Sequence, residues 1–155
     1  MLWGARGEAQ QANEPRAAPE VRADVIAGSR PAVQVGVGVQ IPAGYYVRVG
    51  LDAAVGVRTD APPAGGSSGR VGGRLDLLTR FLLDPFRQST YGLSVGGGLS
   101  LRAEPNDRVR PLLLVAADVE GRRRANGIVP ALQVGLGGGV RVGIVLRRSA
   151  TAGAR

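Results

Sequence analysis

Apolar and polar residues alternate strictly along residues 44–58 of this chain. The odd positions of this stretch hold only apolar or aromatic side chains: Tyr45, Val47, Val49, Leu51, Ala53, Val55 and Val57. The even positions carry charged and small residues, together with one tyrosine: Tyr46, Arg48, Gly50, Asp52, Ala54, Gly56 and Arg58. A period of two over this length predicts a β-strand with one apolar face and one face of charged and small residues.

The same alternation recurs along most of the chain, in segments that are separated by turn residues. These further segments are 21–28, 32–41, 71–83, 91–102, 109–119 and 128–147. Glycine, proline, asparagine and aspartate mark turns at 42–44, 84–88 and 104–107, and 59–69 is a longer polar loop. The segments give eight strands if the first and last parts of the pattern are hairpins, and six if each is one long strand.

One segment has a second interpretation. Residues 74–83, RLDLLTRFLL, also fit an amphipathic helix that would bring Leu75, Leu78 and Leu82 together on one face. A strand and a helix therefore remain alternatives for this segment.

The length of the apolar rows favours a membrane protein, because a tilted transmembrane strand needs roughly 9–11 residues. We expect an all-β fold, an antiparallel up-and-down transmembrane β-barrel of about eight strands, with lipid outside and a polar lumen. The alternative is a soluble β-barrel or sandwich that binds a small ligand, because alternation alone does not say which face is inside. The abundance of glycine, at 25 residues, favours the transmembrane barrel, since a crowded lumen needs small residues and a water-facing surface does not.

The charged faces supply the candidate functional residues. We expect them to point into the lumen and to pair there, because a lone buried charge is prohibitively costly. The candidates for lumen salt bridges are Arg22, Asp24, Arg48, Asp52, Arg74, Asp76, Arg80, Arg110, Asp118 and Arg141. Such a lumen could guide ions or anionic solutes, but eight strands leave room only for side chains, which favours an interior closed by Arg–Asp pairs.

Composition excludes several kinds of chemistry. The 155 residues include no cysteine, histidine or lysine, which removes serine-hydrolase triads and sites built on histidine or thiolate ligands. Asp52, Asp76 and Asp118 could be proposed as acid–base carboxylates, but we expect salt bridges with arginine instead, with Asp118 the least well placed. We therefore expect no enzymatic activity, no catalytic residue and no metal site.

The net charge of +8 raises nucleic acid or an anionic surface as a partner. The arginines, however, alternate with apolar residues along strands and do not cluster with aromatic side chains, so we expect no nucleic-acid partner. The glycine-rich stretches 96–98 and 135–139 complete neither a dinucleotide-binding motif nor a Walker motif, and no cofactor is expected.

The ends of the chain differ from its middle. We expect residues 1–20 to form a disordered leader, residues 21–148 the barrel, and residues 149–155 a frayed tail. Gly7-Glu8-Ala9 has the small-x-small form of a cleavage site, so the leader could equally be the remnant of a signal peptide.

Together, the alternation, the short turns and the single long loop over residues 21–147 resemble the small outer-membrane β-barrels of Gram-negative bacteria, the OmpA-type or porin-like barrels. The resemblance implies a monomer in the bacterial outer membrane, with lipid as its partner and a structural or small-solute passage role. Small solutes or ions would be its other partners. Two features depart from the family: few aromatic residues are available for girdles, and the last strand does not end in an aromatic residue.

Overall fold

The computed structural model describes residues 17–28, 31–59, 69–86, 88–104, 108–122 and 127–148. These residues form eight β-strands: β1 (Ala18–Ala27), β2 (Ala32–Pro42), β3 (Val47–Thr59), β4 (Gly69–Leu82), β5 (Gly92–Ala103), β6 (Arg110–Glu120), β7 (Ile128–Leu136) and β8 (Val140–Arg148). Within the described ranges there is no helix long and apolar enough to cross a membrane.

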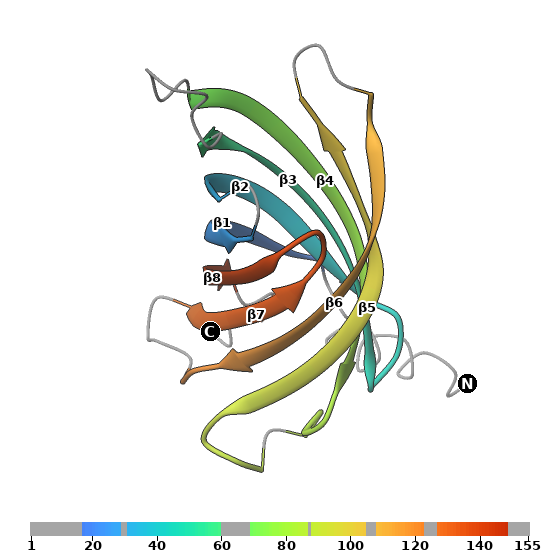
Figure 1. Cartoon of the computed structure of the whole chain (residues 1–155). Helices are drawn as coiled ribbons and strands as arrows, with labels where there is room; N and C mark the ends of the chain where they lie inside the picture. Colours follow the sequence, from blue (N-terminus) through green and yellow to red (C-terminus); the bar gives the residue numbers. More distant parts are fainter. Residues whose placement is uncertain are drawn as a thin grey trace, which may run out of the picture.

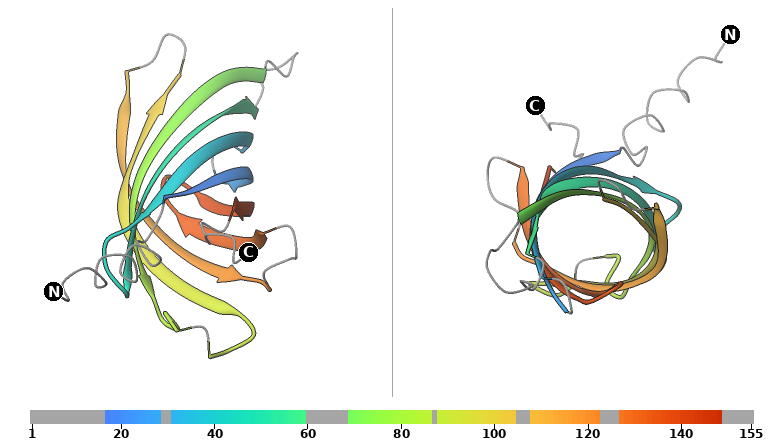
Figure 2. Two further views of the ribbon diagram at one scale, coloured as in Figure 1. Left: turned by 180° about the vertical axis from the view of Figure 1, so that it is seen from behind. Right: turned by 45° about the horizontal axis from the view of Figure 1, so that its top comes forward.

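The strands form one closed sheet. Each strand pairs antiparallel with the next along the chain, and β1 pairs with β8 to complete the barrel. Figure 1 shows the strands following one another around the wall, and the right-hand view of Figure 2 shows the wall as a ring. The predicted all-β, antiparallel, up-and-down barrel is confirmed.

The count of eight strands follows from the hairpins at both ends of the pattern. Residues 128–147 split into β7 and β8 at a glycine turn, where Gly138 and Gly139 have φ values of 68° and 142°. Backbone in this left-handed region favours glycine, so the turn depends on these two residues. Residues 21–41 split in the same way, since β1 and β2 pair from Ala18 with Gln40 to Ile26 with Ala32.

Residues 74–83, for which the sequence left a strand and a helix as alternatives, belong almost entirely to strand β4. β4 pairs with β3 on one side and with β5 on the other, over almost its whole length. Its leucines do not share a face: Leu75 and Leu77 lie outside, whereas Leu78 is buried inside the barrel. The amphipathic helix considered from the sequence is therefore excluded.

Two boundaries differ from the sequence-based expectation. β1 begins at Ala18, so the end of the expected 1–20 leader belongs to the barrel wall, and Glu20 is buried within it. β3 begins at Val47 and not at residue 44, because Gly44 has a φ of 115° and lies in the turn that Ala43 closes on the carbonyl oxygen of Val47. The rest of the leader, most of the 59–69 loop and the 149–155 tail lie outside the described residues.

The wall is apolar outside and polar inside. Valine, leucine and isoleucine are exposed all around the outer face, and four leucines, one from each of β3 to β6, stand in direct register: Leu51, Leu77, Leu99 and Leu113. The buried residues of the described chain include sixteen polar or charged residues and only eight hydrophobic ones. This is the reverse of the usual arrangement in water-soluble domains, where buried charges are rare.

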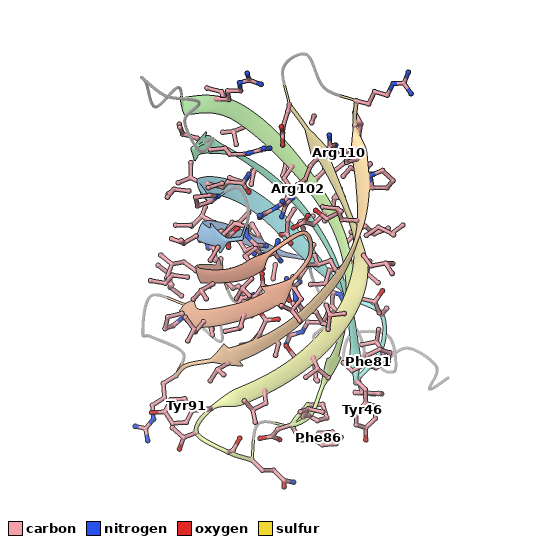
Figure 3. The ribbon with its side chains drawn as sticks, in the orientation of Figure 1. Tyr46, Phe81, Phe86, Tyr91, Arg102 and Arg110 are labelled. Carbon is pink, nitrogen blue, oxygen red and sulfur yellow. The ribbon has the colours of Figure 1, made fainter. Side chains whose placement is uncertain are left out.

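The two ends of the barrel carry different side chains. The end with the β2–β3 and β4–β5 connections, here called the aromatic end, carries Tyr45, Tyr46, Phe81, Phe86 and Tyr91. Tyr46 and Phe86 meet there edge to face, with ring centroids 6.3 Å apart. At the opposite end four arginines, Arg58, Arg70, Arg102 and Arg110, form what is here called the arginine mouth. Figure 3 shows Arg102 and Arg110 at one end and the labelled aromatic residues at the other.

Candidate functional site: the charged interior of the barrel

Below the arginine mouth, the inward face carries equal numbers of opposite charges. Even-numbered residues point inward on β1 to β6, whereas odd-numbered residues point inward on β7 and β8. The alternation of inward and outward residues is therefore shifted by one residue between β6 and β7. Six carboxylates lie inside: Glu20, Asp24, Asp52, Asp76, Asp118 and Glu120. Six arginines accompany them: Arg22, Arg48, Arg74, Arg80, Arg141 and Arg147. The net charge of this set is zero, which is what a buried charged interior requires.

The first group of ion pairs lies toward the aromatic end and centres on Asp118 of β6. Its Oδ2 is 3.0 Å from Arg80 Nε on β4, and its Oδ1 is 3.0 Å from Arg147 Nη2 on β8. Arg147 also reaches Glu20 Oε2 at 2.9 Å and Glu120 Oε1 at 2.8 Å. One arginine therefore ties three strands together at this level of the barrel.

The second group centres on Arg22 of β1, near the middle of the barrel. Its Nε lies 2.9 Å from Asp24 Oδ2 on the same strand, and its Nη1 lies 2.8 Å from Asp52 Oδ2 on β3. A further N–H of Arg22 donates to Gln133 Oε1 on β7. The guanidinium thus uses its fixed fork of donors to join strands that are not neighbours in the sheet.

The third group lies toward the arginine mouth. Arg74 Nη2 is 2.5 Å from Asp24 Oδ2, and Arg74 Nη1 donates to Gln34 Oε1 at 2.7 Å. Asp76 accepts from Arg141 Nη1 at 2.6 Å and lies 3.0 Å from Arg74 Nε. Because Asp24 contacts both Arg22 and Arg74, the second and third groups are continuous.

A neutral side chain connects the groups. Gln133 of β7 donates from Nε2 to Asp118 Oδ1 at 2.8 Å, and its Oε1 accepts from Arg141 Nη2 at 3.0 Å as well as from Arg22. The amide therefore links all three groups of ion pairs. A polar network of this kind is stabilising only while its members are satisfied, because the same low dielectric makes an orphaned charge costly.

Glycine on the inner face makes room for these long side chains. A Cβ at Gly50 would lie 2.5 Å from Arg80 Nη1, and one at Gly38 or Gly143 would strike the carboxylate of Asp52 or Asp24. These charged side chains fit into the interior only because the neighbouring residues are glycines, which have no side chain. At these inward positions, glycine follows from the crowding inside a narrow barrel, as expected from the sequence.

Two adjacent glycines of β5 allow this crowding to be tested. A Cβ at inward-facing Gly98 would overlap the backbone of β4, with Leu78 Cα only 2.8 Å away, whereas one at outward-facing Gly97 would have no neighbour closer than 3.7 Å. Gly98→Ala should therefore lower the free energy of unfolding by about 1–3 kcal/mol, the usual cost of overpacking. Urea unfolding, followed by circular dichroism, measures the loss.

The matched control is Gly97→Ala, which should stay within about 0.5 kcal/mol of the wild type because the new methyl group points away from the interior. Equal effects of the two substitutions would contradict the crowded interior.

The structure brings most of the candidate residues together. Arg22, Asp24, Asp52, Arg74, Asp76, Arg80, Asp118 and Arg141 are all buried in the network described above. Arg48 is half-buried, and its Nη1 lies 3.0 Å from Glu120 Oε1 on the far side of the barrel. Arg110 differs from the expectation: it is exposed at the first residue of β6, in the arginine mouth (Figure 3).

Several interior residues were not among the candidates. Glu20 falls in the expected leader and Glu120 directly follows the expected segment 109–119, although both are buried at strand ends near the aromatic end. Arg147 and the three glutamines Gln34, Gln40 and Gln133 were on the alternating polar face but were not singled out. Continuing the alternation by one or two residues at each strand end would have identified Glu20 and Glu120.

The carboxylates considered for acid–base chemistry are engaged with arginine. Across the described ranges, no group of three or more acidic side chains could hold a metal ion. Asp52, Asp76 and Asp118, the carboxylates considered for acid–base chemistry, each lie within ion-pair distance of at least one arginine. What this interior can do chemically is hold buried charges of opposite sign together.

No protein-family model matches this chain, and no curated protein matches it in sequence.

Proposed function

We propose that this chain is an integral β-barrel of a bacterial outer membrane, whose wall contacts lipid and whose interior is closed by arginine–carboxylate pairs. Its role is then structural, and passage of small solutes is restricted by the closed interior. The main support for the proposal is the distribution of side chains: apolar side chains cover the outside of the barrel, and the buried residues are mainly polar or charged. In this proposal the barrel is a monomer, has lipid as its partner, binds no nucleic acid and is not an enzyme.

The dimensions of the wall support a membrane location. The shortest strands, β7 and β8, have 9 residues each, and β4 has 14. A tilted transmembrane strand needs roughly 9–11 residues, so every strand is long enough. The aromatic end supplies side chains of the kind that sit at the level of lipid headgroups. With the termini in the periplasm, the β3–β4 connection lies outside the cell.

The soluble alternative would expose an apolar surface to water on all sides. Monomeric soluble proteins rarely carry contiguous apolar patches larger than a few hundred Å², whereas here the leucine row alone spans four adjacent strands. A soluble ligand-binding barrel also needs an apolar or open cavity, and this interior is filled with paired charges. Both features support the membrane proposal over the soluble one.

Detergent dependence tests the location. We expect the purified protein to remain folded and monomeric in micelles of a neutral detergent, and to aggregate when the detergent is removed, because the exposed valines and leucines lose their apolar surroundings. Size-exclusion chromatography with light scattering, together with circular dichroism, follows both states. A monodisperse, folded monomer in plain buffer would support the soluble barrel instead.

Planar-bilayer recording tests the closed interior. We expect no conductance steps from the wild-type barrel, because ions would have to break buried pairs whose side chains have almost no solvent exposure. An open porin recorded in the same membrane is the positive control. Reproducible unitary steps at low applied voltage would show a continuous pore and contradict the closed interior.

A further inference from the structure

Two buried acidic side chains, Glu20 and Asp52, stand on either side of one glycine in the sheet. Glu20 of β1 pairs with Gly38 of β2, and Gly38 pairs in turn with Asp52 of β3. Glu20 is 2% exposed and Asp52 is 1% exposed. The two carboxyl groups, here called the carboxyl pair, therefore share one row of the inner wall with no side chain between them.

The carboxyl group of Asp52 leans across this glycine toward Glu20. A Cβ at Gly38 would overlap Asp52 Oδ1, so this oxygen fills the space that a side chain would take. Arg22 Nη1 lies 2.8 Å from Asp52 Oδ2 and 3.7 Å from Glu20 Oε1. Arg80 Nη2 lies 3.7 Å and 4.0 Å from the same two oxygens. The side chains of Glu20 and Asp52 are accordingly in hydrogen-bond contact with each other.

This contact lacks a donor. Glu20 Oε1 and Asp52 Oδ1 are both buried, and neither accepts a hydrogen bond from the part of the chain that the structure describes. An ionised carboxylate only accepts hydrogen bonds, whereas a protonated carboxyl group has one O–H donor. Two adjacent ionised carboxylates also repel each other, which favours a proton on one of them. A proton between the two oxygens supplies the missing donor.

The charged groups around the carboxyl pair are already engaged with one another. Three arginines face the pair from three strands: Arg22 on β1, Arg80 on β4 and Arg147 on β8. Each also binds carboxylates outside the pair, which are Asp24 for Arg22, Asp118 for Arg80, and both Asp118 and Glu120 for Arg147. Asp76 of β4 stands in register with Asp52 and binds Arg141 at 2.6 Å. The surrounding arginines are therefore shared among more carboxylates than the pair alone.

The fully buried groups carry one negative charge in excess. Six carboxylates are buried but only five arginines, because the sixth arginine of the interior, Arg48, has a side chain that is 26% exposed. A buried charge without full compensation favours its neutral form. One proton on the carboxyl pair removes this excess.

We propose that Asp52 and Glu20 bind one shared proton at neutral pH, carried on Asp52 Oδ1 and donated to Glu20 Oε1. The contacts assign the ionised state to Glu20, whose Oε2 accepts from Gln40 Nε2 at 2.8 Å and from Arg147 Nε at 2.9 Å. Asp52 Oδ2 accepts from Arg22. The interior thus contains a proton-binding site in addition to its permanent ion pairs. This site does not depend on whether the barrel lies in a membrane.

Infrared spectroscopy of the whole chain, in neutral detergent micelles at neutral pH, tests for the proton directly. The C=O stretch of a protonated carboxyl group is separate from the bands of ionised carboxylates, and exposed aspartate and glutamate are ionised at this pH. The wild type should show this band with the intensity of one carboxyl group per chain. Absence of the band from the wild type would overturn the proposal, and that measurement needs no variant to fold.

Asp52→Asn and Glu20→Gln should each remove the band. In Asp52→Asn an amide N–H takes the place of the proton, and in Glu20→Gln the new amide donates to Asp52, which then ionises. The matched control is Glu104→Gln, which changes a carboxylate outside the pair and should keep the full band. If the band persists in either Asp52→Asn or Glu20→Gln, the pair does not share the proton.

Unfolding in urea gives an independent measurement. Asp52→Asn and Glu20→Gln both keep the net charge of the protonated pair, so their unfolding midpoints should stay close to that of the wild type. Asp118→Asn removes a charge that lies 3.0 Å from both Arg80 and Arg147, and it should lower the midpoint clearly. If all three variants lower the midpoint alike, Asp52 is ionised like Asp118 and the proposal is wrong.

Discussion

Leu99→Arg should destabilise the barrel by about 2–4 kcal/mol when the protein is folded into lipid vesicles, the cost of placing arginine on the lipid face near the bilayer midplane. Leu99 lies near the middle of β5, in the leucine row of the outer wall, and is 50% exposed. In this proposal its side chain contacts acyl chains, which cannot solvate a guanidinium. Reversible urea titration in vesicles, followed by circular dichroism, gives the free energy of unfolding of both proteins.

The matched control is Leu93→Arg on the same strand. Leu93 also faces outward and is 46% exposed, but it is the second residue of β5, at the aromatic end. A charge near the interface costs only about 0–1 kcal/mol. The difference between the two variants in free energy of unfolding should therefore reflect only the depth of the substituted residue in the bilayer. In a soluble barrel both leucines would face water, and both substitutions would stay within about 0.5 kcal/mol. Equal, small effects would therefore rule out the membrane proposal.

Asp118→Ala should cost about 3–5 kcal/mol, the typical effect of removing one partner of a buried ion pair. The substitution leaves Arg80 and Arg147 without the carboxylate that lies 3.0 Å from each, and it removes the acceptor for Gln133 Nε2. Two guanidinium groups then stay buried with less compensating charge. The same urea titration measures the loss.

Two further variants separate charge imbalance from a simple loss of contacts. Glu104→Ala breaks the more exposed pair with Arg58 at the mouth and should cost no more than about 1 kcal/mol. The double variant Asp118→Ala with Arg147→Met removes one charge of each sign, so its cost should be smaller than the sum of the two single costs. Strict additivity, or a cost below about 1 kcal/mol for Asp118→Ala, would show that the interior does not depend on pairing.

The strands and their inward faces were predictable because alternation is a local property of the sequence. Arg22, Asp52 and Arg80 stand within long, regular stretches, and their direction follows from their parity alone. Strand ends were harder: Glu20 continues the alternation of Arg22 and Asp24, but nothing in the sequence marks Ala18 as the first residue of the strand. Arg110 has an even number, like the inward residues of its strand, yet it is exposed because it is the first residue of β6, at the arginine mouth.

The partners across the interior could not be predicted at all. Arg22 meets Gln133, which is 111 residues away, and Arg48 meets Glu120, which is 72 residues away. Which side chains meet depends on the stagger between strands and on the width of the closed ring, and both emerge only when β1 joins β8. Arg48 and Asp52 stand four residues apart on one strand, yet Arg48 meets Glu120 and Asp52 meets Arg22.

The ion pair between Glu20 and Arg147, 127 residues apart, has a kinetic consequence. Glu20 belongs to the first strand and Arg147 to the last, so this ion pair forms only when the two ends of the sheet come together. A partly inserted sheet would also expose unpaired backbone groups to acyl chains. In the proposed membrane location, insertion should therefore proceed without a stable half-inserted intermediate, and the last strand to pair should determine when the whole barrel enters the bilayer.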